Sequence, residues 1–123
     1  METKSQVSKT HPEYDAMATK WQRCRDTVAG NDAVKAAGTR YLPSLKDQTT
    51  DDYEAYKTRA KWFGATWRTI QALTGMLFRR PPVVETSESV NALLKDVTMS
   101  GVSFLTFAQQ IAMECLTVGR VGI

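Results

Sequence analysis

The stretch DDYEAYKTRAKWFGATWRTIQALTGMLFRRPP, residues 51–82, decides the fold. Its apolar side chains recur at steps of three and four residues, which is the spacing of one face of an α-helix. Thr50 or Asp51 supplies a side-chain oxygen for the N-cap, and the diproline at 81–82 stops any helix. The pattern predicts one long central helix over residues 50–74, with a packing seam that continues to Leu77. The residues of this seam are Tyr53, Tyr56, Phe63, Trp67, Ile70 and Leu77.

A helix of this length needs other elements to cover it. At ~1.5 Å per residue, roughly 24 residues extend about 36 Å, as far as a small domain is wide. Trp62, Leu73 and Met76 widen the seam to a second flank, so we expect the helix to be covered from more than one side. The aromatic and methionine content also fits a ligand pocket, although a seam with this spacing is usually core or subunit interface.

Four shorter helices are expected around the central one. Each is bounded by a glycine or by a short polar residue that suits an N-cap, and the first also begins with a proline at its first helical position. The first, second and last are expected at 12–29, 32–37 and 104–118, and the remaining one begins at a cap within 86–89 and carries its apolar face to Val97. The sequence therefore predicts a mainly α fold of about five helices.

Little β-structure is expected. The diproline favours an extended backbone, and Val83-Val84 after it predicts a short extended segment. Residues 121–123, Val-Gly-Ile, look like the start of a β-strand that has no partner strand in this sequence. We expect residues 1–11 to form a flexible polar arm and residues 12–123 to form a helical portion whose fold is truncated at its C-terminal end.

The composition is that of a globular chain and offers little catalytic chemistry. Hydrophobic residues make up 42% and charged residues 24%, and no apolar run is long enough to span a bilayer. The single histidine and the lack of a G-x-S-x-G motif or a glycine-rich phosphate loop predict no enzyme activity, no cofactor and no metal site. Cys24 and Cys115 lie in apolar patterns and are expected to be buried free thiols.

Charge is unevenly distributed along the chain. Residues 1–82 hold 14 Lys and Arg against 9 Asp and Glu, a balance of +5, whereas residues 83–123 hold 2 against 4, a balance of −2. A nucleic-acid-binding module would concentrate basic residues in a stripe along one helix face, and we find no such stripe. The charges are therefore interpreted as a solvated surface.

Arg79 and Arg80 are the candidate contact residues. Two adjacent arginines before a rigid diproline present guanidinium groups that suit phosphates or the carboxylates of a neighbouring subunit. The alternative is that they end the helix and interact with its C-terminal dipole. The sequence leaves both interpretations open.

Several motifs follow one another along the chain: RYLPSL at 40–45, YEAYKTRA at 53–60, TIQALTGMLFRRPP at 69–82, GVSFLTF at 101–107 and ECLTVGRVGI at 114–123. In this order they resemble the N-terminal part of tailed-bacteriophage portal proteins, and most closely an uncharacterised phage and prophage portal-like subfamily. The resemblance covers nearly all of the chain from about Glu13 onward. Portal proteins are several hundred residues long, so the family's stem, tunnel-lining segments and clip have no counterpart in this sequence.

The resemblance implies the N-terminal part of a portal-type fold and a structural role. Portal proteins form a homo-oligomeric ring, typically a dodecamer, at one capsid vertex, the head-tail connector through which the genome is packaged and ejected. The implied partners are the major capsid protein, the terminase and adaptor or tail proteins, while double-stranded DNA passes through non-specifically. The implied location is the virion, with the host cytoplasm during assembly and no membrane. The family has no catalytic residues, because the motor partner hydrolyses ATP.

A second interpretation is a small stand-alone helical protein of a phage or prophage. Such a protein would bind capsid subunits or other protein partners and modulate their assembly. The two interpretations differ in whether the open reading frame continues past Ile123 and in the oligomeric state of the chain.

Overall fold

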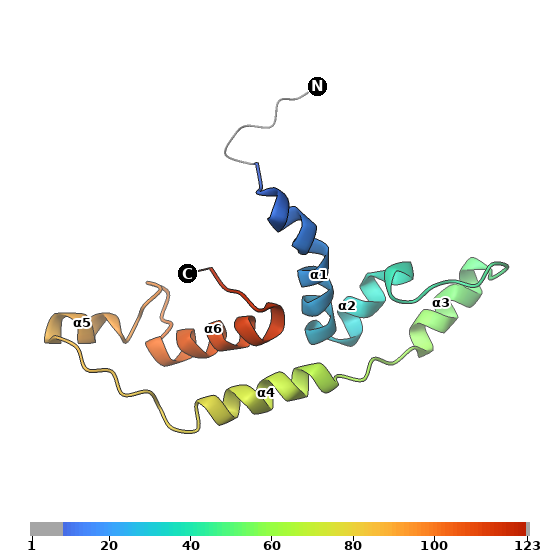
Figure 1. The fold of residues 1–123 in the computed structure, drawn as a ribbon. Helices are drawn as coiled ribbons and strands as arrows, with labels where there is room; N and C mark the ends of the chain where they lie inside the picture. Colours follow the sequence, from blue (N-terminus) through green and yellow to red (C-terminus); the bar gives the residue numbers. More distant parts are fainter. Residues whose placement is uncertain (1–8, 123) are drawn as a thin grey trace. The chain divides into compact units, whose positions relative to one another are not determined.

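The computed structural model describes residues 9–122, and the chain divides into two compact units, Met1–Ala60 and Lys61–Ile123. Every regular element in the described part is a helix, which confirms the expected mainly α class (Figure 1). Residues 1–8 of the expected arm and Ile123 of the expected strand start lie outside the described residues.

The first unit contains the α-helices α1 (Pro12–Ala29), α2 (Asn31–Ala36) and α3 (Thr50–Arg59), with the short 3₁₀ helix η2 (Gly38–Arg40) after α2. The bounds of α1 and α2 confirm the prediction to within a residue or two. Gly30 separates the two helices at a φ of +92°, a conformation that costs glycine little and a side-chain-bearing residue much more.

The first unit has a small core. Helices α1 and α2 pack against each other, and Val34 of α2 is the buried apolar residue of this unit's described part, with 6% of its surface exposed. Helix α3 begins after Thr49, whose hydroxyl accepts a hydrogen bond from the Asp52 backbone N–H at 3.2 Å. A Lys35 Nζ to Thr58 carbonyl hydrogen bond of 2.8 Å ties α2 to α3.

The second unit contains α4 (Ala65–Leu77), α5 (Glu88–Leu93) and α6 (Phe104–Val118). Helices α4 and α6 lie side by side and run in opposite directions (Figure 1). Ile70 and Thr74, one helical turn apart on the same face of α4, are buried at 4% and 8% exposure. This contact is the core of the unit.

The last helix begins and ends where the sequence predicts. The Ser103 hydroxyl accepts a hydrogen bond from the Thr106 backbone N–H at 3.3 Å, and Gly119 closes the helix in the left-handed conformation at a φ of +76°. These are the usual signals for the start and end of a helix.

The predicted single helix over 50–74 is wrong. Two helices, α3 and α4, lie either side of a non-helical segment at 60–64, and α4 continues through Gly75 to Leu77. Ala60 ends α3 with an extended backbone (ψ 135°), and the Ala65 N–H donates to the Phe63 carbonyl at 2.8 Å, which makes a tight turn centred on Gly64. Gly64 favours this break, because a glycine in a helix interior lowers the stability of the helix by about 1 kcal/mol relative to alanine. The spacing of apolar residues at steps of three and four continues across the break in the sequence, but the residues on its two sides do not share one helix face.

Two smaller expectations also fail. Val121 and Gly122 of the expected strand start lie outside any strand in the described part of the chain, whereas Val83 and Val84 lie in a stretch without helix or strand, which the expected extended segment allows. Cys24 and Cys115 are free, as expected, but exposed. Neither α1 nor α6 has a buried residue. An apolar face is buried only where another element covers it, so the apolar pattern of these helices does not predict that their cysteines are buried.

The position of Ile70 in the core gives a test of the packing. We expect Ile70→Ala to lower the free energy of unfolding by about 2 kcal/mol, at the low end for a buried isoleucine because α6 covers only one side of α4. Leu77→Ala is the matched control: Leu77 lies on the same helix but is 63% exposed, so its truncation should cost about 0.5 kcal/mol or less. Urea unfolding followed by circular dichroism measures both. Equal costs would contradict this packing.

Candidate interaction surface

One side of α4 is apolar but uncovered. Leu73, Met76 and Leu77 expose 40%, 72% and 63% of their surface. Because Met76 and Leu77 follow Leu73 by three and four residues, the three side chains lie on one side of the helix, next to the face that carries the buried Ile70 and Thr74. We call Leu73, Met76 and Leu77 the open flank of α4. An adjoining set of exposed apolar side chains of this kind is a candidate interaction surface.

Helix α6 has the same character. Its fifteen residues, FLTFAQQIAMECLTV, contain one charged side chain, Glu114. A helix that is apolar on most sides is normally buried, yet α6 has no buried residue, and Leu105 and Leu116 are exposed. The α4–α6 pair therefore buries only part of the apolar surface that its sequence provides.

Arg79 and Arg80 lie at the end of the open flank. The Arg79 N–H donates to the Met76 carbonyl at 3.4 Å, just after α4 ends at its C-cap Phe78. Both side chains are exposed, and within residues 9–122 neither guanidinium forms an ion pair. Their positive charges are therefore not neutralised by an acidic side chain of the described residues.

The structure divides the predicted packing seam between the two units. Ile70 is buried and Trp67 half-buried on one face of α4, while Phe63 and Leu77 are exposed. Tyr53 and Tyr56 belong to α3 in the first unit, where both are half-buried. The seam is therefore not one continuous stripe.

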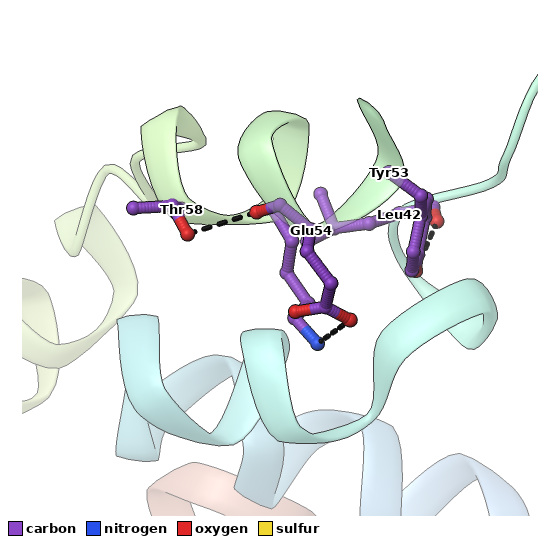
Figure 2. A network of polar contacts seen from close by, with 5 residues as sticks. Leu42, Tyr53, Glu54 and Thr58 are labelled. Carbon is purple, nitrogen blue, oxygen red and sulfur yellow. Dashed lines mark hydrogen bonds and ion pairs between the residues drawn. The ribbon is translucent and has the colours of Figure 1, made fainter. Parts of the chain in front are cut away.

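Tyr53 already has partners in its own unit. Figure 2 shows its hydroxyl directed at the Leu42 carbonyl, to which it donates at 3.0 Å. The centroid of the Tyr53 ring lies 6.2 Å from the centroid of the Tyr56 ring and 5.8 Å from Lys57 Nζ. The tyrosine holds the connector after α2 against α3, so its role is structural.

The polar side chains around Tyr53 satisfy one another locally. Lys57 Nζ pairs with Glu54 Oε1 at 2.7 Å, and the Thr58 hydroxyl donates to the Glu54 carbonyl at 2.8 Å (Figure 2). Neighbours at three and four residues along an exposed helix commonly form such contacts, each with a small stabilising effect. The network supports α3 and offers no catalytic arrangement.

A second polar contact links the end of α1 to the turn after η2. The Tyr41 hydroxyl donates to Asp26 Oδ2 at 2.6 Å, and Gln22 Nε2 donates to Asp26 Oδ1 at 2.7 Å. The hydrogen bond from Tyr41, followed by that from Gln22, lowers the pKa of Asp26 below its ordinary 3.8. The same bond to Asp26 raises the pKa of Tyr41 above 10.0.

The loop between α5 and α6 is held by Asp96. Backbone N–H groups of the loop, that of Gly101 first, lower the pKa of its carboxyl, and the Ser100 N–H donates to Oδ1 at 3.0 Å. The Val97 N–H donates to the Val102 carbonyl at 2.9 Å and closes the loop. Met99 lies at its tip with a φ of 58° and 94% of its surface exposed. Asp96 thus fixes the conformation of the loop that leads into α6.

Sequence reasoning missed Trp62 and Phe63 as surface residues. It placed both on a continuous helix, whereas they lie in the 60–64 segment with 41% and 77% of their surface exposed. The available signal was Gly64, a residue that interrupts a helix more readily than any of its neighbours there. Over residues 9–122, no group of three metal-ligating side chains comes together and no helix is long and apolar enough to cross a membrane.

Comparisons with protein-family models, with curated proteins and with solved structures find no match to this chain.

The Asp26–Tyr41 contact predicts a pH-dependent stability. Tyr41→Phe removes the hydrogen bond but keeps the ring, so we expect a loss of about 1 kcal/mol at neutral pH. Because the pKa of Asp26 is lowered, its contribution is present above 3.8 and is lost as the pH falls through the folded-state value. Because the pKa of Tyr41 is raised, its contribution is present below 10.0 and is lost as the pH rises through the folded-state value.

The difference in unfolding free energy between the wild type and Tyr41→Phe should therefore be constant from about pH 5 to 9 and shrink at both ends. Urea titrations within this range, and beyond it below the pKa of Asp26 and above the pKa of Tyr41, measure it. Tyr56→Phe is the matched control, because the described part of the chain shows no hydrogen bond from the Tyr56 hydroxyl. A difference close to zero at neutral pH would show that the ring, not the hydrogen bond, is what Tyr41 contributes. A difference that stays the same at both pH extremes would contradict the pairing of Tyr41 with Asp26.

Proposed function

We propose that this chain is a structural subunit of a phage portal ring at the capsid vertex. In that role the ring serves as the conduit for genome packaging and ejection and as the docking site for terminase and for tail or adaptor proteins. The proposal is supported by the ordered motifs that resemble the N-terminal region of portal proteins. The observation that carries it is the open flank of α4, an apolar surface beside a core contact that covers only one side of the helix.

A neighbouring subunit is the natural cover for this surface. Assembly interfaces that persist are apolar at their centre and polar at their rim. The open flank supplies the apolar part, and Arg79 and Arg80 supply cations at one end of it. In a ring, each copy would present the same flank to the next copy by a repeated rotation.

The positive charges of Arg79 and Arg80, at one end of the open flank, suit negatively charged groups of the proposed partners. Carboxylates of an adjacent subunit would pair with Arg79 and Arg80 in the forked geometry that guanidinium groups favour. Double-stranded DNA would pass without being held, since tight phosphate binding requires many clustered cations. Capsid, terminase and adaptor proteins remain the macromolecular partners under this proposal.

The stand-alone interpretation uses the same flank with a different partner. A small phage or prophage protein that modulates assembly would cover its α4 with a foreign capsid or other protein surface instead of a second copy. The oligomeric state of the purified chain therefore separates the two functions.

The test is the mass of the chain by size-exclusion chromatography with light scattering, followed by electron microscopy of any oligomer. We expect a ring that the double variant Leu73→Asp with Leu77→Asp reduces to monomers, because charges cannot enter an apolar contact without a partner. Leu45→Asp is the matched control, since Leu45 is 77% exposed but lies in the first unit, away from the flank in sequence. A wild-type chain that stays monomeric at high concentration contradicts the ring and favours the alternative.

Arg79→Glu combined with Arg80→Glu tests the rim. Charge reversal should weaken assembly, and added salt should then favour the residual assembly instead of opposing it, because salt screens the repulsion that replaces the ion pairs. Rings that form equally well in this variant would remove the two arginines from the interface. Mass spectrometry of purified particles from the phage or prophage that encodes the chain then checks its place in the virion, where one ring per particle is expected.

A further inference from the structure

The break between α3 and α4 exposes two consecutive aromatic side chains. In a continuous helix Phe63 would lie one turn before Trp67 on the buried face, with Trp62 at its flank. In the structure the helix is interrupted at 60–64, and Phe63 and Trp62 expose 77% and 41% of their surface. Large aromatic surface next to solvent at this level marks a binding surface.

The surroundings of these aromatics are basic. Residues 55–84 contain six cations and no Asp or Glu, namely Lys57, Arg59, Lys61, Arg68, Arg79 and Arg80. Lys61 directly precedes the aromatic pair, and Arg68 lies in the second turn of α4; both are exposed. The first turn of α4 carries no acidic side chain. Lys57 is already paired with Glu54, which lies just before this segment, so the charge that an anion meets beside the two aromatic rings comes from Lys61 and Arg68.

The apolar residues of the segment are aromatic rather than aliphatic. Between 57 and 69 there is no Leu, Ile, Val or Met, and the apolar side chains are Trp62, Phe63, Trp67 and two alanines. Insertion into a lipid surface or a protein groove usually draws on aliphatic side chains as well. Flat rings next to cations are instead the arrangement that stacks nucleobases and neutralises the phosphates between them.

We propose that Trp62 and Phe63, together with Lys61 and Arg68, bind single-stranded nucleic acid. The two rings stack on unpaired bases, and the two cations contact the adjoining phosphates. A duplex is a poorer ligand because its bases are already stacked on one another. The site is distinct in residues from the open flank of α4, so it holds or fails independently of the proposed portal function.

The experiment measures fluorescence anisotropy of a labelled oligothymidine of about 20 nucleotides, longer than the site of one small domain, with the full 123-residue chain at low salt. We expect binding that a duplex of the same length competes for only weakly. Trp62→Ala and Phe63→Ala should each weaken binding about 5- to 100-fold, the usual effect of removing one stacking ring. Met99→Ala is the matched control, because Met99 is 94% exposed but lies in the loop before α6.

Conservative variants separate stacking from simple apolar contact. Phe63→Tyr keeps a flat ring and should bind like the wild type, whereas Phe63→Leu keeps an apolar side chain without a π-face and should bind like Phe63→Ala. Lys61→Gln and Arg68→Gln should each reduce the slope of log affinity against log salt by about 0.7, the value for one phosphate contact on a single strand. Lys95→Gln, an exposed lysine outside the segment, should leave the slope unchanged.

Three outcomes overturn the proposal. The first is no binding of the oligothymidine at low salt, and the second is binding that is unaffected by Phe63→Ala. The third is equal binding by Phe63→Leu and the wild type together with stronger, Phe63-dependent binding to vesicles of phosphatidylcholine and phosphatidylserine, which would assign the segment to an anionic membrane surface. Circular dichroism confirms that each variant keeps its helices; since both aromatics are exposed, their substitution should not unfold the unit.

Discussion

The contact between α4 and α6 is the constraint on which the second unit depends. It buries Ile70 and Thr74 and little else, and the Thr74 hydroxyl has no hydrogen-bond partner in the described part of the chain. A buried hydroxyl without a partner costs free energy, so even this small core is not fully favourable. The caps at Ser103 and Gly119 and the loop held by Asp96 shape α6 locally, but they add no apolar cover. Under the proposed function, a partner that covers the open flank would add the apolar burial that this unit has little of.

Helix α4 and the segment before it present two surfaces of different chemistry. The open flank at Leu73, Met76 and Leu77 is aliphatic, whereas the segment at Trp62 and Phe63 is aromatic and basic. Aliphatic side chains favour a shape-matched apolar partner, because their stabilising effect depends on the area removed from water. Aromatic rings beside cations add the attraction of a π-face for a base and of a charge for a phosphate. Under the two proposals, helix α4 and the segment before it would contact two kinds of partner through sets of residues that do not overlap.

Local signals in the sequence predicted local structure well. Pro12, Gly30, Ser103 and Gly119 mark the ends of helices in the sequence and in the structure alike, because a cap depends on a few adjacent residues. The break at 60–64 was not predicted, since a step of three or four residues continues across it and the spacing alone cannot distinguish one helix from two. Burial was predicted least well: Phe63, Leu77 and both cysteines fit apolar patterns yet are exposed. A pattern shows which face is apolar, whereas burial depends on what covers that face.

The two uncovered apolar surfaces of the α4–α6 pair bear on how an assembly would grow. If α6 of one copy packs on the open flank of α4 in the next copy, a single kind of contact covers both surfaces. The first copy then still has an uncovered open flank, and the last copy still has an uncovered α6. Such a head-to-tail contact continues indefinitely unless the rotation between copies closes it into a ring. A two-fold dimer would instead bring the same surface of both copies together, flank to flank or α6 to α6, and would leave the other surface exposed. Under the proposed function, two different uncovered surfaces, one on each helix, therefore suit a head-to-tail contact better than a two-fold dimer.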